Sequence, residues 1–292
     1  IDVYGKLIDE IDEQAFRCLR SLEKLDLSCN KLKMLPKQLF YELSNLEILS
    51  LHQNQLSSIH KDSFKNLIRL SDLNLNENRL GNQNLSALFG GLKSIKNINL
   101  ESNGIEEIVS RAFEGLSLLS YLKLGKNRLK TIPNDLLRSL VALYFLSLTN
   151  NQLEELIDGL LDEKKCVHAD FSHNKLRSIS KFLFKKCHRL LYLFLSHNQI
   201  ESLDCASFDG LSSLIWLKLE YNNIKCIESN LFHSLIALTD LDISHNPIES
   251  LIDPNTKQSI FKDLAKIKIL RLNDLKVRVL EENTFGGLPH LT

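Results

Sequence analysis

Leu25-Asp26-Leu27-Ser28-Cys29-Asn30-Lys31-Leu32 is the stretch that decides the fold, because its pattern L-x-L-x-x-N-x-L recurs along the chain. Successive copies are 23 to 25 residues apart when they are aligned on the asparagine. The recurring asparagines are Asn30, Asn54, Asn78, Asn103, Asn127, Asn151, Asn174, Asn198, Asn222 and Asn246. Two further turns, with Lys6 and Leu275 at the asparagine position, depart from the pattern and bring the total to about twelve repeats. A single unit of this size cannot bury its own apolar face, so neighbouring units must stack into a solenoid.

Each position of the repeat has a predicted role. The alternation L-x-L predicts a short strand whose leucines point inward and whose x residues point outward. The asparagine side chain is expected to bond backbone groups freed where the strand turns into the loop, which would give a ladder of asparagines. A phenylalanine ten residues after the asparagine, as at Phe40, predicts an aromatic spine on the opposite side, replaced by leucine at Leu137 and Leu161.

Composition excludes several classes of protein. The 36 Lys and Arg residues balance the 36 Asp and Glu residues, which argues against a general binder of nucleic acid or of anionic membranes. The longest apolar stretch, 140–146, is too short to cross a bilayer, so we expect membrane attachment only through a segment outside this chain. Motifs for dinucleotide, phosphate or zinc binding and for a serine nucleophile elbow do not occur in the sequence. We therefore predict a protein that is not an enzyme and that needs no cofactor.

The repeat resembles the leucine-rich repeat family in its 24-residue form, which is typical of extracellular proteins. The resemblance covers essentially the whole chain and rests on the ten asparagine positions. It implies an α/β solenoid shaped as a horseshoe, with a concave parallel β-sheet and a convex side of loops and 3-10 turns. Residues 1–292 are expected to form this one solenoid. Its ends lack the cysteine-rich caps of the family, so we interpret the chain as part of a longer protein.

One insertion interrupts the repeat. Residues 252–259 lengthen the interval between Asn246 and Leu275 to 29 residues, and their Pro-Asn pair predicts a turn that protrudes from the loop side. Leu275 replaces the asparagine of the next turn, so the ladder is expected to end before it. A tolerated surface insertion is the favoured interpretation over a functional loop.

Six cysteines and one sequon bear on the cellular compartment. Cys166 and Cys187 replace core leucines and are either buried free thiols or a staple on the convex side. Cys205 and Cys226 lie at x positions of adjacent repeats and are a candidate disulfide. Asn84-Leu85-Ser86 is a candidate N-glycosylation site in a loop. Secretion, with an extracellular or cell-surface location, is implied mainly by the family resemblance.

Aromatic residues gather at outward positions of the predicted strands. The row just before the first ladder leucine holds a ring in five consecutive repeats, and the next outward row adds Phe194 and Lys218. The predicted ligand-binding residues are Tyr121, Phe145, His168, Tyr192, Phe194, Trp216 and Lys218. Exposed rings with a few charges among them are typical of interface hot spots, although strands also favour aromatic residues for structural reasons. A protein ligand is favoured because a curved sheet has no deep pocket, and a glycan stays an alternative.

Another row of residues, immediately before each asparagine, contains His173, His197 and His245. A pH-sensitive contact or an adventitious metal site would suit these side chains. Because Ser-His-Asn recurs three times as part of the repeat, solvated histidines are the favoured interpretation.

These observations predict a non-enzymatic recognition module that binds a protein through the concave face. By resemblance, innate-immunity receptors of the Toll type, hormone receptors and neuronal adhesion proteins carry this repeat. Two alternatives stay open: a structural subunit that assembles with itself or with neighbouring chains into an extracellular array, and a cytosolic scaffold with reduced thiols. Homo- or hetero-oligomers fit the first of these.

Overall fold

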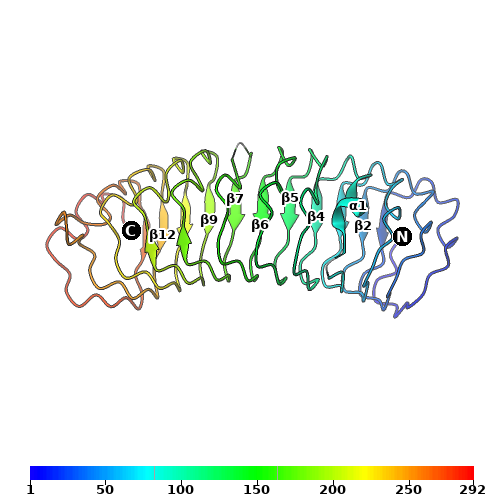
Figure 1. The fold of residues 1–292 in the computed structure, drawn as a ribbon, viewed down its shortest axis with the longest axis horizontal. Helices are drawn as coiled ribbons and strands as arrows, with labels where there is room; N and C mark the ends of the chain where they lie inside the picture. Colours follow the sequence, from blue (N-terminus) through cyan, green and yellow to red (C-terminus); the bar gives the residue numbers. More distant parts are fainter. Residues whose placement is uncertain (82, 163) are drawn as a thin grey trace. The chain divides into compact units, whose positions relative to one another are not determined.

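The structure of the chain is a computed structural model, and it describes residues 1–81, 83–162 and 164–292. It divides into two compact units, Ile1–Leu148 and Thr149–Thr292, which are described separately. Each unit is a stack of turns whose short strands pair in parallel (Figure 1). This arrangement confirms the predicted solenoid. A single solenoid over residues 1–292 stays a prediction.

Unit 1, Ile1–Leu148, forms its sheet from strands paired in parallel, each with the next one along the chain. The strands are β1 (Lys24–Asp26), β2 (Ile48–Ser50), β3 (Asp72–Asn74), β4 (Asn97–Asn99), β5 (Tyr121–Lys123) and β6 (Phe145–Ser147). Corresponding repeat positions face each other, as in the pair Leu25 and Leu49. Asp2 adds a single parallel bridge to Asp26, so the first turn joins the same sheet.

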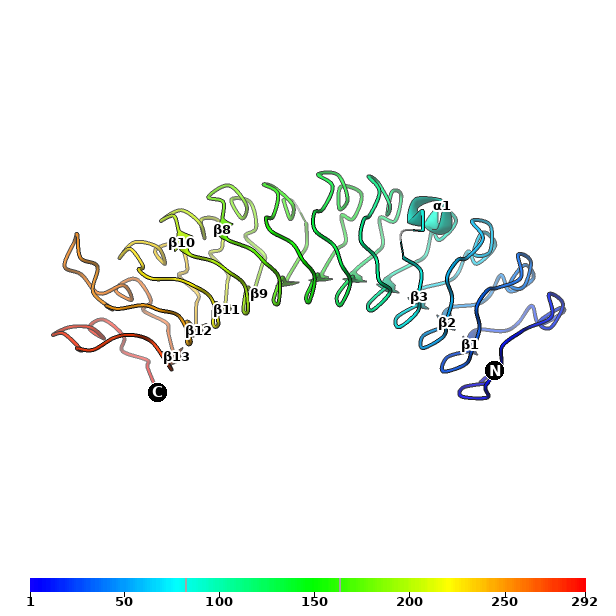
Figure 2. The ribbon, with the colours of Figure 1, turned by 60° about the horizontal axis from the view of Figure 1, so that its bottom comes forward.

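Unit 2, Thr149–Thr292, repeats the arrangement. Its strands on the same side of the turns are β7 (His168–Asp170), β9 (Tyr192–Phe194), β11 (Trp216–Lys218), β12 (Asp240–Asp242) and β13 (Ile269–Arg271). Two further strands, β8 (Ser178–Ile179) and β10 (Ser202–Leu203), pair with each other. They lie across the turns from the main strands, as Figure 2 shows. The repeat pattern did not predict this second pair.

The asparagine ladder is confirmed in both units. All ten asparagines are buried. Asn54 illustrates the bonding, since it bonds the backbone of its own turn and of the preceding one. Its Oδ1 accepts a hydrogen bond from the Leu32 amide at 3.0 Å, and its Nδ2 donates to the carbonyls of Leu27 and Leu51 at 3.0 and 3.1 Å. Because unpaired buried backbone groups cost about 1–3 kcal/mol each, the ladder both closes a turn and fixes it to its neighbour.

The predicted aromatic spine is also present. Phe40 stacks on Phe64 with ring centroids 6.2 Å apart in unit 1, and Phe208 stacks on Phe232 at 6.4 Å in unit 2. The turn between β3 and β4 contains a helix, α1 (Leu85–Phe89), which the sequence pattern did not predict. Burial of Leu85, Leu88 and Phe89 packs one face of α1 against the core. The helix adds another ring to the spine, since Phe89 stacks on Phe113 at 5.9 Å.

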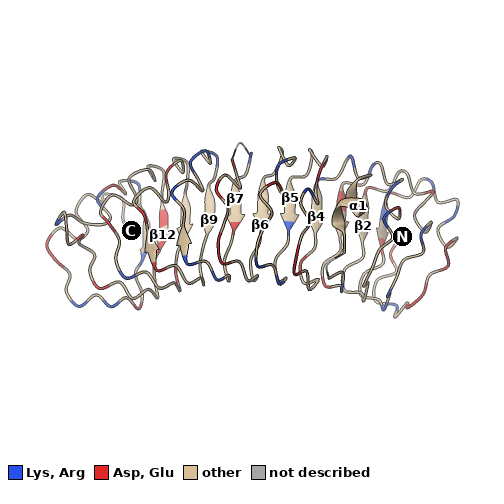
Figure 3. Ribbon diagram, in the orientation of Figure 1, with Lys and Arg blue, Asp and Glu red and all other residues tan. Residues whose placement is uncertain are grey.

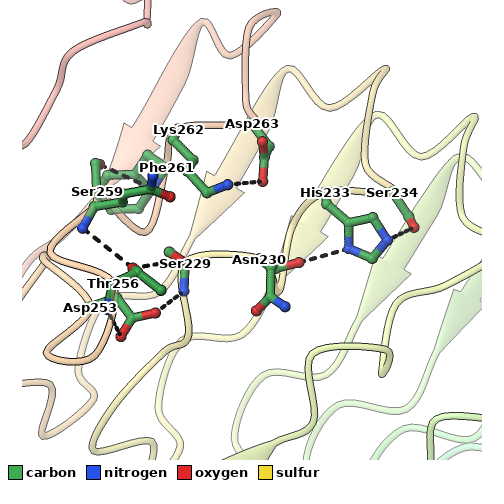
Figure 4. Close-up of polar contacts among 11 residues, drawn as sticks. Ser229, Asn230, His233, Ser234, Asp253, Thr256, Ser259, Phe261, Lys262 and Asp263 are labelled. Carbon is green, nitrogen blue, oxygen red and sulfur yellow. Dashed lines mark hydrogen bonds and ion pairs between the residues drawn. The ribbon is translucent and has the colours of Figure 1, made fainter.

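The insertion at residues 252–259 has an exposed tip, as predicted, but its ends are hydrogen-bonded to both neighbouring turns. Figure 4 shows the contact of Asp253 with Ser229 of the preceding turn. Ile252 and Ser259 form an antiparallel bridge. The Asp253 carboxylate is 3% exposed and accepts hydrogen bonds from the amides of Ser229 and Asn255, each at 2.8 Å. On the other side, the Ser259 hydroxyl donates to the Thr284 carbonyl at 2.6 Å. These bonds make the insertion an integral part of the stack.

All six cysteines are free thiols in the structure. Cys166 and Cys187 are buried, and burial raises the pKa of each thiol to about 12. The structure therefore agrees with the free-thiol interpretation of this pair. Cys205 is half-buried and Cys226 is exposed, also as free thiols, and their disulfide stays a prediction. Within the described residues, no helix combines the length and apolar character needed to cross a membrane.

Candidate ligand-binding face

The strand face consists of the side chains at the first and third positions of the three-residue strands. In most of these strands the central residue is covered by the core, as for Leu217, while the flanking residues reach solvent, as for Trp216 and Lys218. In β13 the central Leu270 is half-buried, and in β6 the flanking Ser147 is buried. Parallel pairing in register then places equivalent positions of adjacent turns side by side. Rings at these positions are brought into contact by the fold.

Unit 2 holds a ring cluster made of His168, Tyr192, Phe194 and Trp216, which we call the unit 2 ring cluster. The imidazole of His168 meets Phe194 edge to face, with centroids 4.8 Å apart, and lies 5.7 Å from Tyr192. Tyr192 in turn meets Trp216 edge to face at 5.3 Å. Edge-to-face packing is a favoured geometry for aromatic pairs, so these contacts favour one arrangement of the rings relative to one another. Trp216 is 43% exposed and supplies apolar area for contact.

Charges border this cluster. The Lys218 ammonium lies 5.2 Å from the centroid of Phe194, a cation–π distance. Burial lowers the pKa of His168, an effect opposed by the nearby Asp170 carboxylate. The cluster therefore presents a neutral imidazole and three rings beside a lysine near neutral pH.

Unit 1 holds a second group of rings. Tyr121 and Phe145 have centroids 6.0 Å apart in a stacked arrangement, and the Lys123 ammonium lies 5.9 Å from the Phe145 centroid. Tyr144 adds a third ring, 5.7 Å from Tyr121 and 43% exposed. The sequence analysis missed Tyr144, which directly precedes Phe145 of the outward row. The available signal was a second aromatic residue next to a predicted strand-face ring.

A shallow hollow of about 400 Å³ lies beside the unit 1 rings on strands β2 to β5. Tyr121 and Lys123 line one side of it, and the rest of the lining combines aliphatic residues, such as Ile48 and Leu73, with polar ones. Among these, the Asn97 amide donates to the Asp72 carboxylate. The hollow offers hydrogen-bonding groups next to an exposed ring, whereas the unit 2 ring cluster is mainly apolar.

The structure thus brings the predicted ligand-binding residues together in two groups. Tyr121 and Phe145 belong to unit 1, while His168, Tyr192, Phe194, Trp216 and Lys218 belong to unit 2. Their role in binding stays a prediction. Asn84, the predicted glycosylation site, is not in an irregular loop: it is the exposed N-cap of α1. Its Oδ1 accepts from the Ser86 amide and hydroxyl, at 3.1 and 2.8 Å.

The row before the asparagines forms a column of stacked rings in unit 2. His173 and His197 have centroids 4.1 Å apart, Tyr221 lies 4.3 Å beyond His197, and His245 lies 4.0 Å beyond Tyr221, with planes within 11° of parallel. All four residues have φ between 53° and 56°, an uncommon region for residues other than glycine. His173 and His197 are exposed, in agreement with the predicted solvated histidines, and their rings are also stacked on each other. Burial and the neighbouring His173 lower the pKa of His197.

No group of three or more metal-ligating side chains is present within residues 1–81, 83–162 and 164–292. A stack of parallel imidazoles directs its ring edges outward and its faces at one another, which does not converge on a single ion. The metal-site alternative for the histidine row has no support in this geometry.

The fold and the ladder define a solenoid repeat protein that presents ordered side chains on a strand face. The sequence matches the family model described as "Leucine rich repeat" over residues 20–80, 83–153, 170–219 and 198–248, so the chain belongs to the leucine-rich repeat family. A search of curated protein sequences returns no match to the chain.

Solved structures with similar folds include two that contain a bound partner. A chain in the Toll–Spatzle complex of Drosophila, a hub in development and innate immunity, matches with a TM-score of 0.87 and 23% identity over 97% of this chain and 37% of that one. A chain in the TLR13–ssRNA13 complex matches with a TM-score of 0.79 and 27% identity over 99% of this chain and 44% of that one. A leucine-rich-repeat protein of Leptospira interrogans matches with a TM-score of 0.66, at 23% identity, over 100% of this chain and 88% of that one.

The present chain spans less than half the length of the first two neighbours. One neighbour is in complex with a protein and the other with single-stranded RNA. The prediction that the chain binds no nucleic acid, which was based on its zero net charge, is therefore not supported. A net charge of zero says nothing about the charge of a local surface.

Proposed function

We propose that the chain is a non-enzymatic binding module that recognises a protein through the strand face, with the unit 2 ring cluster as its anchor. The observation that carries this proposal is the contact network of Tyr192, Phe194 and Trp216, which places large rings in a fixed arrangement at a surface. Large rings that become buried when a partner binds contribute most of the binding energy of protein interfaces. We further propose an extracellular or lumenal location, in line with the resemblance to Toll and TLR13.

The binding test begins with the chain as bait against an array of purified extracellular proteins, followed by Kd measurement for each partner. Trp216→Ala combined with Tyr192→Ala is expected to cost about 2 kcal/mol or more, which is roughly a 30-fold rise in Kd. The physical reason is that both rings lose their contact area and their edge-to-face contact at once.

The matched control is Ile236→Ala combined with Val279→Ala. These two apolar residues of unit 2 are 61% and 69% exposed and lie outside its strands. The control is expected to leave Kd within about twofold, since exposed apolar residues away from an interface contribute little. The proposal would be refuted if the ring variant left Kd unchanged, or if the control variant raised Kd by the same factor as the ring variant.

Single-stranded RNA is the second ligand class. Two observations favour it: the likeness to TLR13, whose structure holds ssRNA13, and the presence of Lys218 among rings on which bases could stack. The same variants measured against a poly-uridine oligonucleotide separate the two classes. A protein ligand is favoured here because Tyr192 and Trp216 form one continuous aromatic surface, which suits apolar side chains.

A further inference from the structure

One turn of unit 2 carries a concentration of positively charged residues outside the main strands. Residues 171–191 contain six Lys and Arg residues and no Asp or Glu, in a chain whose total charge is zero. We call this set the basic ridge: Lys175, Arg177, Lys181, Lys185, Lys186 and Arg189. All six side chains are exposed. Their segments are among those coloured blue between β7 and β12 in Figure 3.

The ridge follows the path of the turn. Lys175 and Arg177 come directly after the ladder residue Asn174, and Arg189 comes just before β9. The three lysines between them follow β8, on the side opposite the main strands. The charges therefore run along one turn instead of crossing several turns.

Two of these lysines share one aromatic ring. The ammonium groups of Lys181 and Lys185 lie 5.2 and 5.9 Å from the centroid of Phe182, which is itself 50% exposed. Neither lysine has a carboxylate partner within the described part of the chain, whereas Lys186 pairs with Asp162 at 3.4 Å. Like charges gathered at one ring repel each other, and a bound anion would relieve this repulsion.

The turns on either side are acidic. The preceding turn, tied to the ridge by a hydrogen bond from the Lys175 amide to the Leu153 carbonyl, carries Asp158 and Asp162. The following turn, tied to it through the Glu201 amide and the Arg177 carbonyl, carries Asp204 and Asp209. An anionic membrane is flat and would bring these carboxylates against lipid phosphates. A thin linear polyanion can follow the ridge and meet fewer of them, since Asp162 is already paired with Lys186.

We propose that the basic ridge binds a sulfated polysaccharide whose chain runs along the turn. Sulfate groups accept charge-assisted hydrogen bonds from ammonium and guanidinium groups, and each bound sulfate releases a counterion. A single-stranded nucleic acid fits less well because sequence-tolerant binding of unstacked bases needs several aromatic platforms, and the ridge offers only Phe182. The site lies away from the strand face, so it can act independently of the proposed protein ligand.

Heparin is the probe for the test. Its affinity for the purified chain is measured by calorimetry at several salt concentrations around 150 mM, roughly the physiological value, with and without Lys181→Glu combined with Lys185→Glu. The control reverses the same number of charges elsewhere in unit 2, in Lys225→Glu combined with Lys276→Glu, both exposed. The ridge variant is expected to weaken heparin binding by at least about tenfold and to flatten its salt dependence, while the control changes affinity by less than about threefold.

Three results would overturn the proposal. An equal loss in both variants would mean that only total charge matters. Binding of desulfated heparin as tight as that of heparin would remove the role of sulfate. Tighter binding to phosphatidylserine vesicles or to poly-uridine RNA would assign the ridge to another partner. Circular dichroism checks that each variant is folded, and Lys181→Gln combined with Lys185→Gln replaces any charge-reversal variant that is not.

Discussion

Asn222 provides a direct test of how much the asparagine ladder stabilises the solenoid. In the structure its Oδ1 accepts a hydrogen bond from the Ile200 amide at 3.0 Å. Its Nδ2 donates to the carbonyls of Leu195 and Leu219, at 3.0 and 2.9 Å. The side chain is 5% exposed, so water cannot replace these partners without opening the turn. Replacing Asn222 by alanine removes all of these bonds at once.

The magnitude follows from the number of orphaned groups. Each of the three short bonds contributes about 1 kcal/mol net, and the buried Ile200 amide is left without an acceptor at a further cost of about 1–3 kcal/mol. We therefore expect Asn222→Ala to lower the free energy of unfolding by about 4 kcal/mol. Such a loss is a large fraction of the stability of a typical domain.

Chemical denaturation with urea, followed by circular dichroism, measures the effect. The neighbouring Asn223 is the matched control, because it is exposed and only its backbone amide bonds the preceding turn, at the Ile200 carbonyl. Asn223→Ala is expected to change the free energy of unfolding by less than about 0.5 kcal/mol. A loss below about 1 kcal/mol for Asn222→Ala, or equal losses for both variants, would refute the reasoning that the ladder holds the turns together.

Two further predictions concern single positions in unit 2 and its insertion. Gly210→Ala would place a Cβ atom 2.3 Å from the Phe184 carbonyl oxygen at φ +91°, so thermal unfolding should show a loss of about 3 kcal/mol or more. Gly104→Ala, with φ +69° and open space around it, should cost only about 1 kcal/mol, and similar losses for the two would contradict the steric argument. The Asp253 carboxylate has a pKa held well below its ordinary value, first by the hydrogen bond from the Ser229 amide. A carboxylate whose pKa is lower in the folded state than its unfolded value of about 3.9 stabilises the fold above that pH, and this stabilisation is lost as the pH falls. Asp253→Asn should therefore make the free energy of unfolding less dependent on pH below about pH 5. An unchanged pH dependence would mean that Asp253 is not the responsible group.

Much of the fold could be predicted from the sequence because its determinants are local and repeat with a fixed period. The spacing of Leu25, Leu27 and Asn30 predicted which residues enter the core, and the same spacing placed Trp216 and Tyr192 on the strand face. In a solenoid, each turn contacts only its neighbours, so a periodic sequence carries nearly all the information about which positions meet.

The departures arose where one turn differs from the rest. Asn84 became a helix N-cap because Leu85, Leu88 and Phe89 of the same turn have a helical spacing that packs them into the core. The sequence favoured a tolerated surface insertion, but in the structure the Asp253 carboxylate accepts a hydrogen bond from the Ser229 amide of the preceding turn. Such bonds depend on the path of two backbones together, which a one-dimensional pattern does not describe.

The sequence by itself determined the solenoid, the ladder and the two faces of each strand, since these follow from residue spacing and burial alone. Only the tertiary structure decided which side chains touch. It showed that His173 stacks on His197, that Phe194 meets His168 edge to face, and that two lysines share the ring of Phe182. Register fixes which Cβ atoms are neighbours, but the direction of each ring depends on the rotamers allowed by the turns on both sides.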